Sequence, residues 1–498
     1  MADRSAEVSA PFGASRPIGR AMRIVGSAVA VRPSRHSLVV TAALGTGLVL
    51  GAAVPFVDRA LLLVGLASCL IISIVAFYPQ FAAYLLIGIT PLVAGMDRGS
   101  VIPVIRPNEA VLALVAAGLV LRTILTARTG SLAWPRMDAQ SASILFVAVA
   151  ASVIPLAWML LRNQQVEMDD VLYALLPCKY YGVYLVVRAS AKIERQVRTC
   201  LWISMGTAAI VGVLAILQSL LVPVVTRFLV TYYTSFGYTA AVTDQRGGST
   251  LSLSIAVADL MIFNLAIAVG FLYRRIGPRI PTFALGMLFV AGVLAAAQFS
   301  GAIGLVIGMV IIAVVLRRFR PLAAFIPAFA LAAYGLRPVI ESRLTSFQSA
   351  SGLPESWIGR WHNLTNYFWP VLFDRGNFIL GVRPAARVVA PHRAAGYIWI
   401  ESGYTWLLWG GGIPLVLAFL YFLWVNVRYG LHVARTRLDS VGVAGLASVV
   451  ALGVVACLMT LDPHLTYRGS ADLLFMLLAL TAVKAVDAGP NPAPEGAA

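Results

Sequence analysis

Charged residues are scarce in this chain of 498 residues, and their scarcity excludes an ordinary soluble protein. Asp, Glu, Lys and Arg together make up 12% of the residues, whereas hydrophobic residues make up 60%. A soluble domain carries about 25% charged residues, because it must cover a surface that faces water. The composition therefore predicts that lipid solvates most of the surface of this chain.

Cysteine and histidine are also rare, and their spacing excludes the common sites built from them. The four cysteines, Cys69, Cys178, Cys200 and Cys457, lie in or beside apolar runs and lack CxxC spacing. We therefore expect neither disulfides nor cysteine metal sites. The five histidines are scattered, and the chain contains no HExxH and no nucleotide-binding glycine loop. No metal, no cofactor and no ATP-driven chemistry is expected.

Acidic residues are outnumbered, which leaves a formal net charge of +17. A nucleic-acid partner is not expected, because the basic residues do not form one tract with interleaved aromatic residues. They lie instead in short breaks between long apolar runs. We count about fourteen runs that can cross a membrane. These runs lie near 37–56, 60–78, 80–96, 109–121, 141–161, 171–187, 197–222, 250–273, 281–298, 300–316, 320–335, 402–427, 441–460 and 469–485.

The distribution of the basic residues predicts the orientation of these spans. If the N-terminus is cytoplasmic, the inward connections hold most of the short-loop arginines, as the positive-inside rule requires. Both termini are then cytoplasmic. The inward basic groups lie within 4–35, 122–136, 188–198, 274–279, 317–320 and 428–437.

The expected fold is an all-α, polytopic membrane helical bundle with one long extracytoplasmic loop. We expect one transmembrane domain, 37–485, between a disordered basic tail, 1–36, and a second disordered tail, 486–498. The long loop spans 336–401 and faces outward on this topology. Polar side chains and irregular backbone need water or a protein cavity, so this loop is where chemistry is expected.

The long loop is rich in arginine, contrary to the positive-inside rule. A planar guanidinium forms bidentate bonds to phosphate, so outward arginines suggest an anionic ligand. The alternative is that individual arginines pair with loop acids or with lipid phosphates. We regard Arg343 and Arg383 as candidate substrate-binding residues within the set of Arg337, Arg343, Arg360, Arg375, Arg383, Arg387 and Arg393.

Within the loop, residues 355–373 predict an amphipathic helix. Apolar residues recur there at spacings of three or four, and Trp and Tyr suit the membrane interface. The helix could simply cap the bundle. Arg360 stands beside the stripe, where it could reach a lipid phosphate. The stripe consists of Ile358, Trp361, Leu364, Phe368 and Leu372.

A second candidate is Arg246, in an outward loop that leads into a span. Gly247, Gly248 and Ser249 follow it, so an anion could approach the backbone closely near a helix N-terminus. Asp259 in the same span and Lys179 in the 171–187 span fall deep within the membrane. We predict that Lys179 and Asp259 pair with each other in a central cavity; the alternative is that hydroxyl groups or water satisfy each separately.

The third candidate is Glu401, where the loop re-enters the membrane. A partly desolvated carboxylate beside aromatic rings could have the raised pKa that suits a general base. The alternative is an interfacial ion pair with a loop arginine, and the two roles are compatible. The glycines at 410–412 should let neighbouring helices pack closely.

Three segments of the chain resemble one family. QRGGSTLSLS resembles an Arg-x-x-Gly stretch, GRWHNLTNYFWPVLFDRGNFILGV a Gly-Arg helix followed by a glycine turn, and ESGYTWLLWGGGIPL a re-entry motif. Together with the many spans and one late long loop, they resemble the O-antigen ligase and Wzy-type polysaccharide polymerase family. The resemblance covers roughly residues 140 to 430.

The resemblance implies a function and a set of site residues. The family consists of inverting, metal-independent transferases that act on undecaprenyl-pyrophosphate-linked glycans at the outer face of the bacterial inner membrane. It implies that Arg246 and Arg360 contact the pyrophosphate. At the re-entry, ligases carry His-Asn where this chain has Glu401-Ser402, which favours a polymerase and leaves His392 as an alternative base. A flippase and chain-length regulators are the implied protein partners.

A transporter is the alternative from another class, namely a lipid-linked oligosaccharide flippase. Such a protein would be expected to show two similar halves with functional charges near the midplane. The chain has no evident internal repeat, and its polar residues gather in one late loop. These features favour a transferase.

Overall fold

The computed structural model describes residues 59–98, 105–126, 137–234, 243, 245–319, 323, 325–344, 354–390 and 396–483. The chain divides into two units, Met1–Cys69 and Leu70–Ala498. The described part of the first unit is the start of helix α2, Arg59–Phe77. The predicted tails, 1–36 and 486–498, and the predicted span 37–56 lie outside the described residues.

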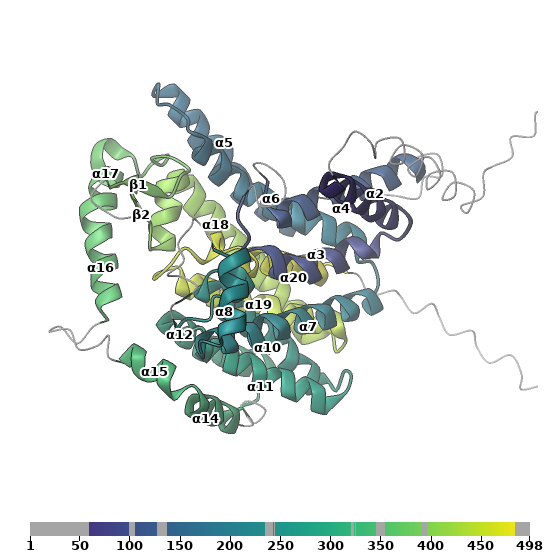
Figure 1. The fold of residues 1–498 in the computed structure, drawn as a ribbon. Coiled ribbons are helices and arrows are strands. Elements are labelled where there is room, and N and C mark those ends of the chain that lie inside the picture. The colour runs from purple at the N-terminus through teal and green to yellow at the C-terminus, as the bar shows by residue number, and fades with distance from the viewer. Residues whose placement is uncertain are drawn as a thin grey trace, which may run out of the picture. The chain divides into compact units, whose positions relative to one another are not determined.

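The described part of the second unit is almost entirely helical (Figure 1). Its one described sheet is an antiparallel pair, β1 (Arg387–Val389) and β2 (Tyr397–Trp399). Four single turns, η3 (Ser249–Leu251), η5 (Leu364–Phe368), η6 (Asp374–Gly376) and η7 (His464–Thr466), connect or extend the helices. The helices are α3 (Gln80–Val93), α4 (Pro107–Thr126), α5 (Ala139–Leu161), α6 (Met168–Ser190), α7 (Glu194–Ser219), α8 (Pro223–Tyr232), α10 (Ser254–Arg274), α11 (Arg279–Ala295), α12 (Phe299–Leu316), α14 (Ile326–Gly335), α15 (Arg337–Leu344), α16 (Glu355–Asn363), α17 (Trp369–Phe373), α18 (Gly403–Thr436), α19 (Ser440–Leu458) and α20 (Ser470–Thr481).

Eight described helices are long and apolar enough to cross a membrane, namely α4, α5, α6, α7, α10, α12, α18 and α19. The expected all-α membrane architecture is therefore confirmed, whereas the number of about fourteen spans stays a prediction. Helix α14 covers only Ile326–Gly335 of the predicted span 320–335. Ten helical residues extend about 15 Å, half of a bilayer core, so α14 alone is too short to cross.

Helices α10 and α19 form the centre of the second unit. Their most apolar windows are 89% and 83% buried, respectively, far more than those of the other long helices. Small residues permit the close packing: a Cβ at Gly270 would lie 2.8 Å from Val443, and one at Gly445 would lie 3.0 Å from the Gly430 carbonyl oxygen. Helices in lipid associate through such close backbone approaches.

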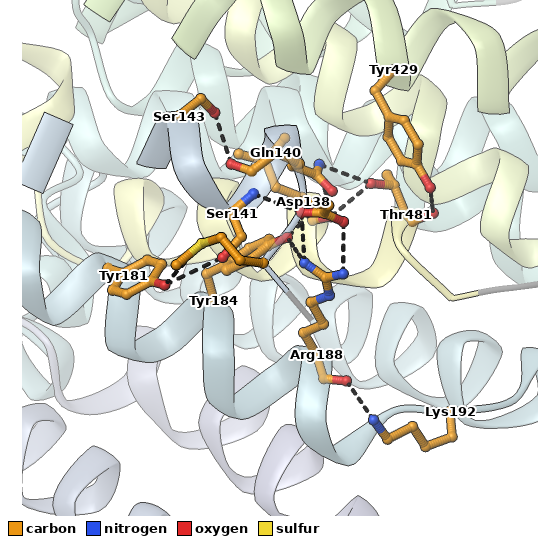
Figure 2. A network of polar contacts seen from close by, with 12 residues as sticks. Asp138, Gln140, Ser141, Ser143, Tyr181, Tyr184, Arg188, Lys192, Tyr429 and Thr481 are labelled. Carbon is orange, nitrogen blue, oxygen red and sulfur yellow. Dashed lines mark hydrogen bonds and ion pairs between the residues drawn. The ribbon is translucent and has the colours of Figure 1, made fainter. Parts of the chain in front are cut away.

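Several inward-predicted connections meet at one end of the bundle, which we call the basic end. Arg188 of α6 lies 2.7 Å from Asp138, and Figure 2 shows this pair within a polar network that includes Thr481. Arg274 of α10 donates to the Ala434 carbonyl at 2.6 Å. These inward-predicted connections thus lie together, and the side of the membrane that they face stays a prediction.

Outward-predicted connections meet at the other end, which we call the loop end. The Gly403 N–H donates to the Met459 carbonyl at 2.7 Å, and the Gly247 N–H donates to the Ala295 carbonyl at 3.0 Å. Helix α18 thus runs from Gly403 at the loop end to Thr436 at the basic end. The cytoplasmic location of the basic end stays a prediction.

A break in α18 fixes the long loop to the bundle. Gly412 has φ 63° and ψ −156°, and the two halves of α18 meet there. The opened backbone is paired with the loop: the Val382 N–H donates to the Trp409 carbonyl at 2.7 Å, and the Ile413 N–H donates to the Ile379 carbonyl at 3.1 Å. Arg162, which caps α5, holds the same loop turn through the Val382 carbonyl at 2.9 Å.

The glycines at 410–412 have separate roles. A Cβ at Gly411 would lie 2.6 Å from the Ala150 carbonyl oxygen of α5, so close helix packing is confirmed there. A Cβ at Gly412 would overlap the Ile379 carbonyl, whereas one at Gly410 would have no neighbour within 4 Å.

We expect Gly412→Ala to lower the stability by more than about 2 kcal/mol, because it combines a positive φ with a backbone clash. Gly410→Ala is the matched control and should be neutral or stabilising by up to about 1 kcal/mol. Thermal unfolding in detergent measures both variants. Equal melting temperatures for the two would contradict this account of the break.

Candidate functional site

Arg360 links the long loop to the connection between α19 and α20. Its Nη1 donates to Oδ2 of Asp462 at 2.8 Å, and its Nε lies 3.9 Å from Oε1 of Glu401. Asp462 is 4% exposed and Glu401 is 35% exposed. The guanidinium therefore lies between a buried carboxylate and an accessible one. The structure brings together two of the three predicted catalytic residues.

Glu401 is in contact with Arg360 but is not hydrogen-bonded to it, because 3.9 Å exceeds a hydrogen-bond distance. Its other oxygen, Oε2, accepts from Nδ2 of Asn363 at 3.2 Å. Asn363 lies three residues after Arg360 on the same helix, so one turn of α16 orients both partners of Glu401. The alternative expectation, an ion pair with a loop arginine, is thus realised in this structure, and the role of Glu401 as a base stays a prediction.

Behind Asp462 lie polar residues that the sequence did not single out. Tyr467 forms a side-chain hydrogen bond with Asp462. His464 is fully buried, and its Nδ1 lies 2.7 Å from Oδ2 of Asp259. The segment TLDPHLTYRGS, a polar break between two apolar runs on the predicted outward side, was the available signal.

The predicted pair of Lys179 with Asp259 is wrong. Lys179 binds Asp472 of α20 at 2.8 Å, and Asp259 binds His464. Asp472 is fixed for this role because it also accepts from the Gly469 N–H at 2.9 Å at the start of its helix. A buried charge needs a polar or charged partner, as expected, but both partners come from the C-terminal part of the chain. The role of Lys179 and Asp259 in substrate binding stays a prediction.

Arg246 begins a segment that is buried between helices. Gly247 packs against the backbone of Ala215 in α7, where an added Cβ would lie 2.7 Å from the carbonyl oxygen. The Ser249 hydroxyl donates to the Val211 carbonyl at 2.9 Å, and the Thr250 hydroxyl donates to the Pro91 carbonyl at 2.8 Å. The small residues after Arg246 therefore serve close packing at the loop end. A shared pocket for Arg246, Arg360 and Glu401 stays a prediction.

Two other loop arginines are held by an acidic run at the start of α6. Arg383 makes two bonds to Asp170, from Nε at 2.9 Å and from Nη2 at 2.6 Å. These bonds, with Glu167 nearby, raise the pKa of the Arg383 guanidinium. Arg387 pairs with Asp169 and stacks on Tyr397, 3.9 Å from its ring centre.

These pairs give the long loop a structural attachment that the sequence analysis missed. The signal was available, because three acids in four positions, in EMDD, lie on the same predicted side as the arginines. For Arg383 a role in substrate binding stays a prediction. Arg343 stacks on Phe299 at 5.4 Å, and His392 lies outside the described residues.

The predicted amphipathic helix is present, but its apolar face is divided. Residues 355–373 are helical from α16 through η5 to α17. Leu364, Phe368 and Leu372 are buried, whereas Ile358 and Trp361 are exposed. Turn η5 has π-helical bonding, and its wider turn changes the register between the two halves. The stripe residues of the first half are therefore exposed, while Arg360 and Asn363 of the same half contact Asp462 and Glu401.

Comparisons with protein-family models, with curated proteins and with solved structures find no match for this chain. The family resemblance stays a prediction. Within the described ranges, no group of three or more His, Cys, Asp and Glu side chains is arranged to hold a metal ion. The function is therefore argued from the geometry around Arg360.

We expect Arg383→Gln to destabilise the fold by about 3–5 kcal/mol, because Asp170 would remain as a buried, unpaired charge. Arg375→Gln is the matched control: Arg375 is 89% exposed, and its loss should change stability by less than about 0.5 kcal/mol. Melting temperatures in detergent measure both. Similar values for the two variants would show that the Arg383 bonds do not hold the loop.

A second prediction concerns the pH dependence of stability. Burial raises the pKa of the Asp462 carboxyl above its ordinary value, although Arg360 opposes the shift. The folded protein then takes up this proton at a higher pH than the unfolded chain, so Asp462 contributes most to stability at low pH. We expect the melting temperature of the wild type minus that of Asp462→Asn to fall as pH rises through the raised pKa. A difference that grows with pH would contradict the shift.

Proposed function

We propose that the protein is a metal-independent glycosyltransferase that moves a glycan from undecaprenyl pyrophosphate to a sugar hydroxyl. The observation that carries the proposal is the position of Arg360, between buried Asp462 and accessible Glu401. An oriented guanidinium beside an accessible carboxylate supplies the two groups that such a transfer needs, an anion stabiliser and a proton acceptor.

The reaction follows from these two groups. The acceptor oxygen forms a bond to the anomeric carbon while the bond from that carbon to the pyrophosphate oxygen breaks. The bonding electrons leave with the pyrophosphate, and Arg360 stabilises the negative charge that develops there. Glu401 takes the proton of the acceptor hydroxyl. Asp462 holds the guanidinium in place throughout. No further free energy is therefore needed to orient the guanidinium when the reaction occurs.

Two further arginines support an anionic substrate at the loop end. Arg246 begins the segment that packs on α7, and Arg343 lies over Phe299 at the start of α12. We assign both to the pyrophosphate or to an anionic sugar. Within the proposal, Glu401 in place of a histidine favours a polymerase over a ligase. The protein would act in the bacterial inner membrane with both termini in the cytoplasm, beside a flippase and a chain-length regulator.

A transporter is the second candidate, and one observation favours it. One ion pair, Lys179 with Asp472, and one hydrogen-bonded pair, His464 with Asp259, are buried among apolar helices. Buried charges of this kind also mark ion and substrate pathways in transporters. The two functions differ in their products, because a transferase lengthens or attaches the glycan and a flippase moves it unchanged.

Proteoliposomes loaded with a lipid-linked oligosaccharide test the proposal. We expect wild-type protein to increase product length on a gel. Arg360→Ala should lower the rate by about 10²–10³, the loss expected for one stabilising donor, and Arg360→Lys should restore little of it because Lys lacks the fork geometry. Glu401→Gln should lower the rate by about 10²–10⁴, as for loss of a general base.

Exposed Arg375→Ala is the matched control and should retain activity. Full transfer by Arg360→Ala would overturn the role of the guanidinium. Movement of an unchanged glycan across the bilayer, without any lengthening or attachment, would favour the transporter.

A further inference from the structure

A pocket of about 370 Å³ lies on α18 at the basic end, away from Arg360. Its lining contains three basic side chains, and these recur at spacings of four and three along the helix, so they share one face. Arg428, Leu431, His432, Arg435 and Thr436 form the lining. The opposite face of α18 is buried, with Gly430 packed against Val449 and Ser448 of α19.

The residue types on the same outward face of α18 change in order along the helix axis. Leu417 and Leu420 are 59% and 50% exposed, and Trp424, 56% exposed, follows them one turn later. Arg428 stands one turn beyond Trp424, with its guanidinium 5.1 Å from the indole centre. This order, from aliphatic to Trp to basic residues, is the order of the acyl chains, the interface and the phosphates in a bilayer.

The depth along the helix agrees with this order. Trp424 is 21 residues beyond Gly403, where α18 starts at the loop end. At 1.5 Å per residue the two helical halves, joined at the kink at Gly412, rise about 30 Å in all, which is comparable with the thickness of a hydrocarbon core. The order of side chains beyond the kink therefore places Trp424 at one interface, and the basic pocket then lies at the level of the headgroups.

The two arginines of the pocket differ from several of their neighbours. At the same end, Arg188 pairs with Asp138, Arg437 pairs with Asp439, and Arg274 donates to backbone carbonyls. Arg428 and Arg435 make no ion pair with a carboxylate of the described residues. Two guanidinium groups and an imidazole along one open face of the helix complement a phosphate group.

We infer that this face of α18 binds an anionic phospholipid. The headgroup phosphate occupies the pocket between the three basic side chains, and the acyl chains lie along Leu417 and Leu420 beside Trp424. The occupant is a membrane phospholipid, because a free phosphate would make no contact with the exposed apolar residues Leu417, Leu420 and Trp424 of this face. The inference does not depend on the proposed transferase activity, which is placed at the loop end.

The test uses the purified full chain in a non-ionic detergent, titrated with fluorescent phosphatidylglycerol and followed by anisotropy. Arg428→Gln/Arg435→Gln should weaken binding about 30-fold, since each basic side chain near a membrane surface contributes about 1 kcal/mol. Arg435→Gln alone should weaken it about fivefold. The single variant keeps the test valid if the double variant does not fold.

Arg195→Gln/Arg198→Gln on α7 is the matched control, because it removes two exposed positive charges of the predicted cytoplasmic surface without touching the pocket. We expect its affinity for phosphatidylglycerol to equal that of the wild type. The inference is overturned if the control loses as much affinity as the pocket variant, if the pocket variants bind normally, or if phosphatidylcholine binds the wild type as tightly. Competition by inorganic phosphate as strong as by phosphatidylglycerol would also overturn it.

Discussion

A charge removed from water must meet a counterion, and this constraint organises the loop end of the bundle. Asp170 is fully buried and is tolerated because Arg383 makes two bonds to it. Asp462 is buried and is matched by Arg360. In both pairs the arginine comes from the long loop, whereas the acid comes from the first turn of α6 or from the connection after α19. The bonds that neutralise the buried acids therefore also attach the loop. Further buried pairs join Lys179 to Asp472 and His464 to Asp259.

The same constraint explains why the two acids beside Arg360 differ in burial and in distance. A guanidinium held only by accessible acids would be mobile and screened by water. Because Asp462 is buried and receives a second bond from Tyr467, it fixes one edge of the Arg360 guanidinium. Glu401 lies at a longer distance and remains more exposed. A site that binds an anion and accepts a proton needs this combination of one fixed cation and one available base.

Our two proposals assign different partners to the two ends of the helices. At the loop end, Arg360, Arg383 and Arg387 of the long loop are engaged with acids of the protein. At the basic end, Arg428 lies beside Trp424, and neither Arg428 nor Arg435 forms an ion pair with a carboxylate of the described residues. Helix α18 joins both ends, and its break at Gly412 separates the half that follows Glu401 from the half that carries Arg428 and Arg435.

The family resemblance implied that Arg360 and Glu401 share a site, whereas the membrane class and the division of the connections between two ends follow from apolar run length and from arginine distribution. These are local properties, which a sequence displays directly. The partners of Lys179 and Asp259 were mispaired, and Asp462 was overlooked, because contacts between residues 102 to 293 positions apart depend on helix packing. The role of Asp169 and Asp170 in binding loop arginines likewise could not be predicted from the sequence, because it depends on the loop lying against α6. Only the tertiary structure selects among several acids on one side of a membrane, since charge pairing needs distances of a few ångströms.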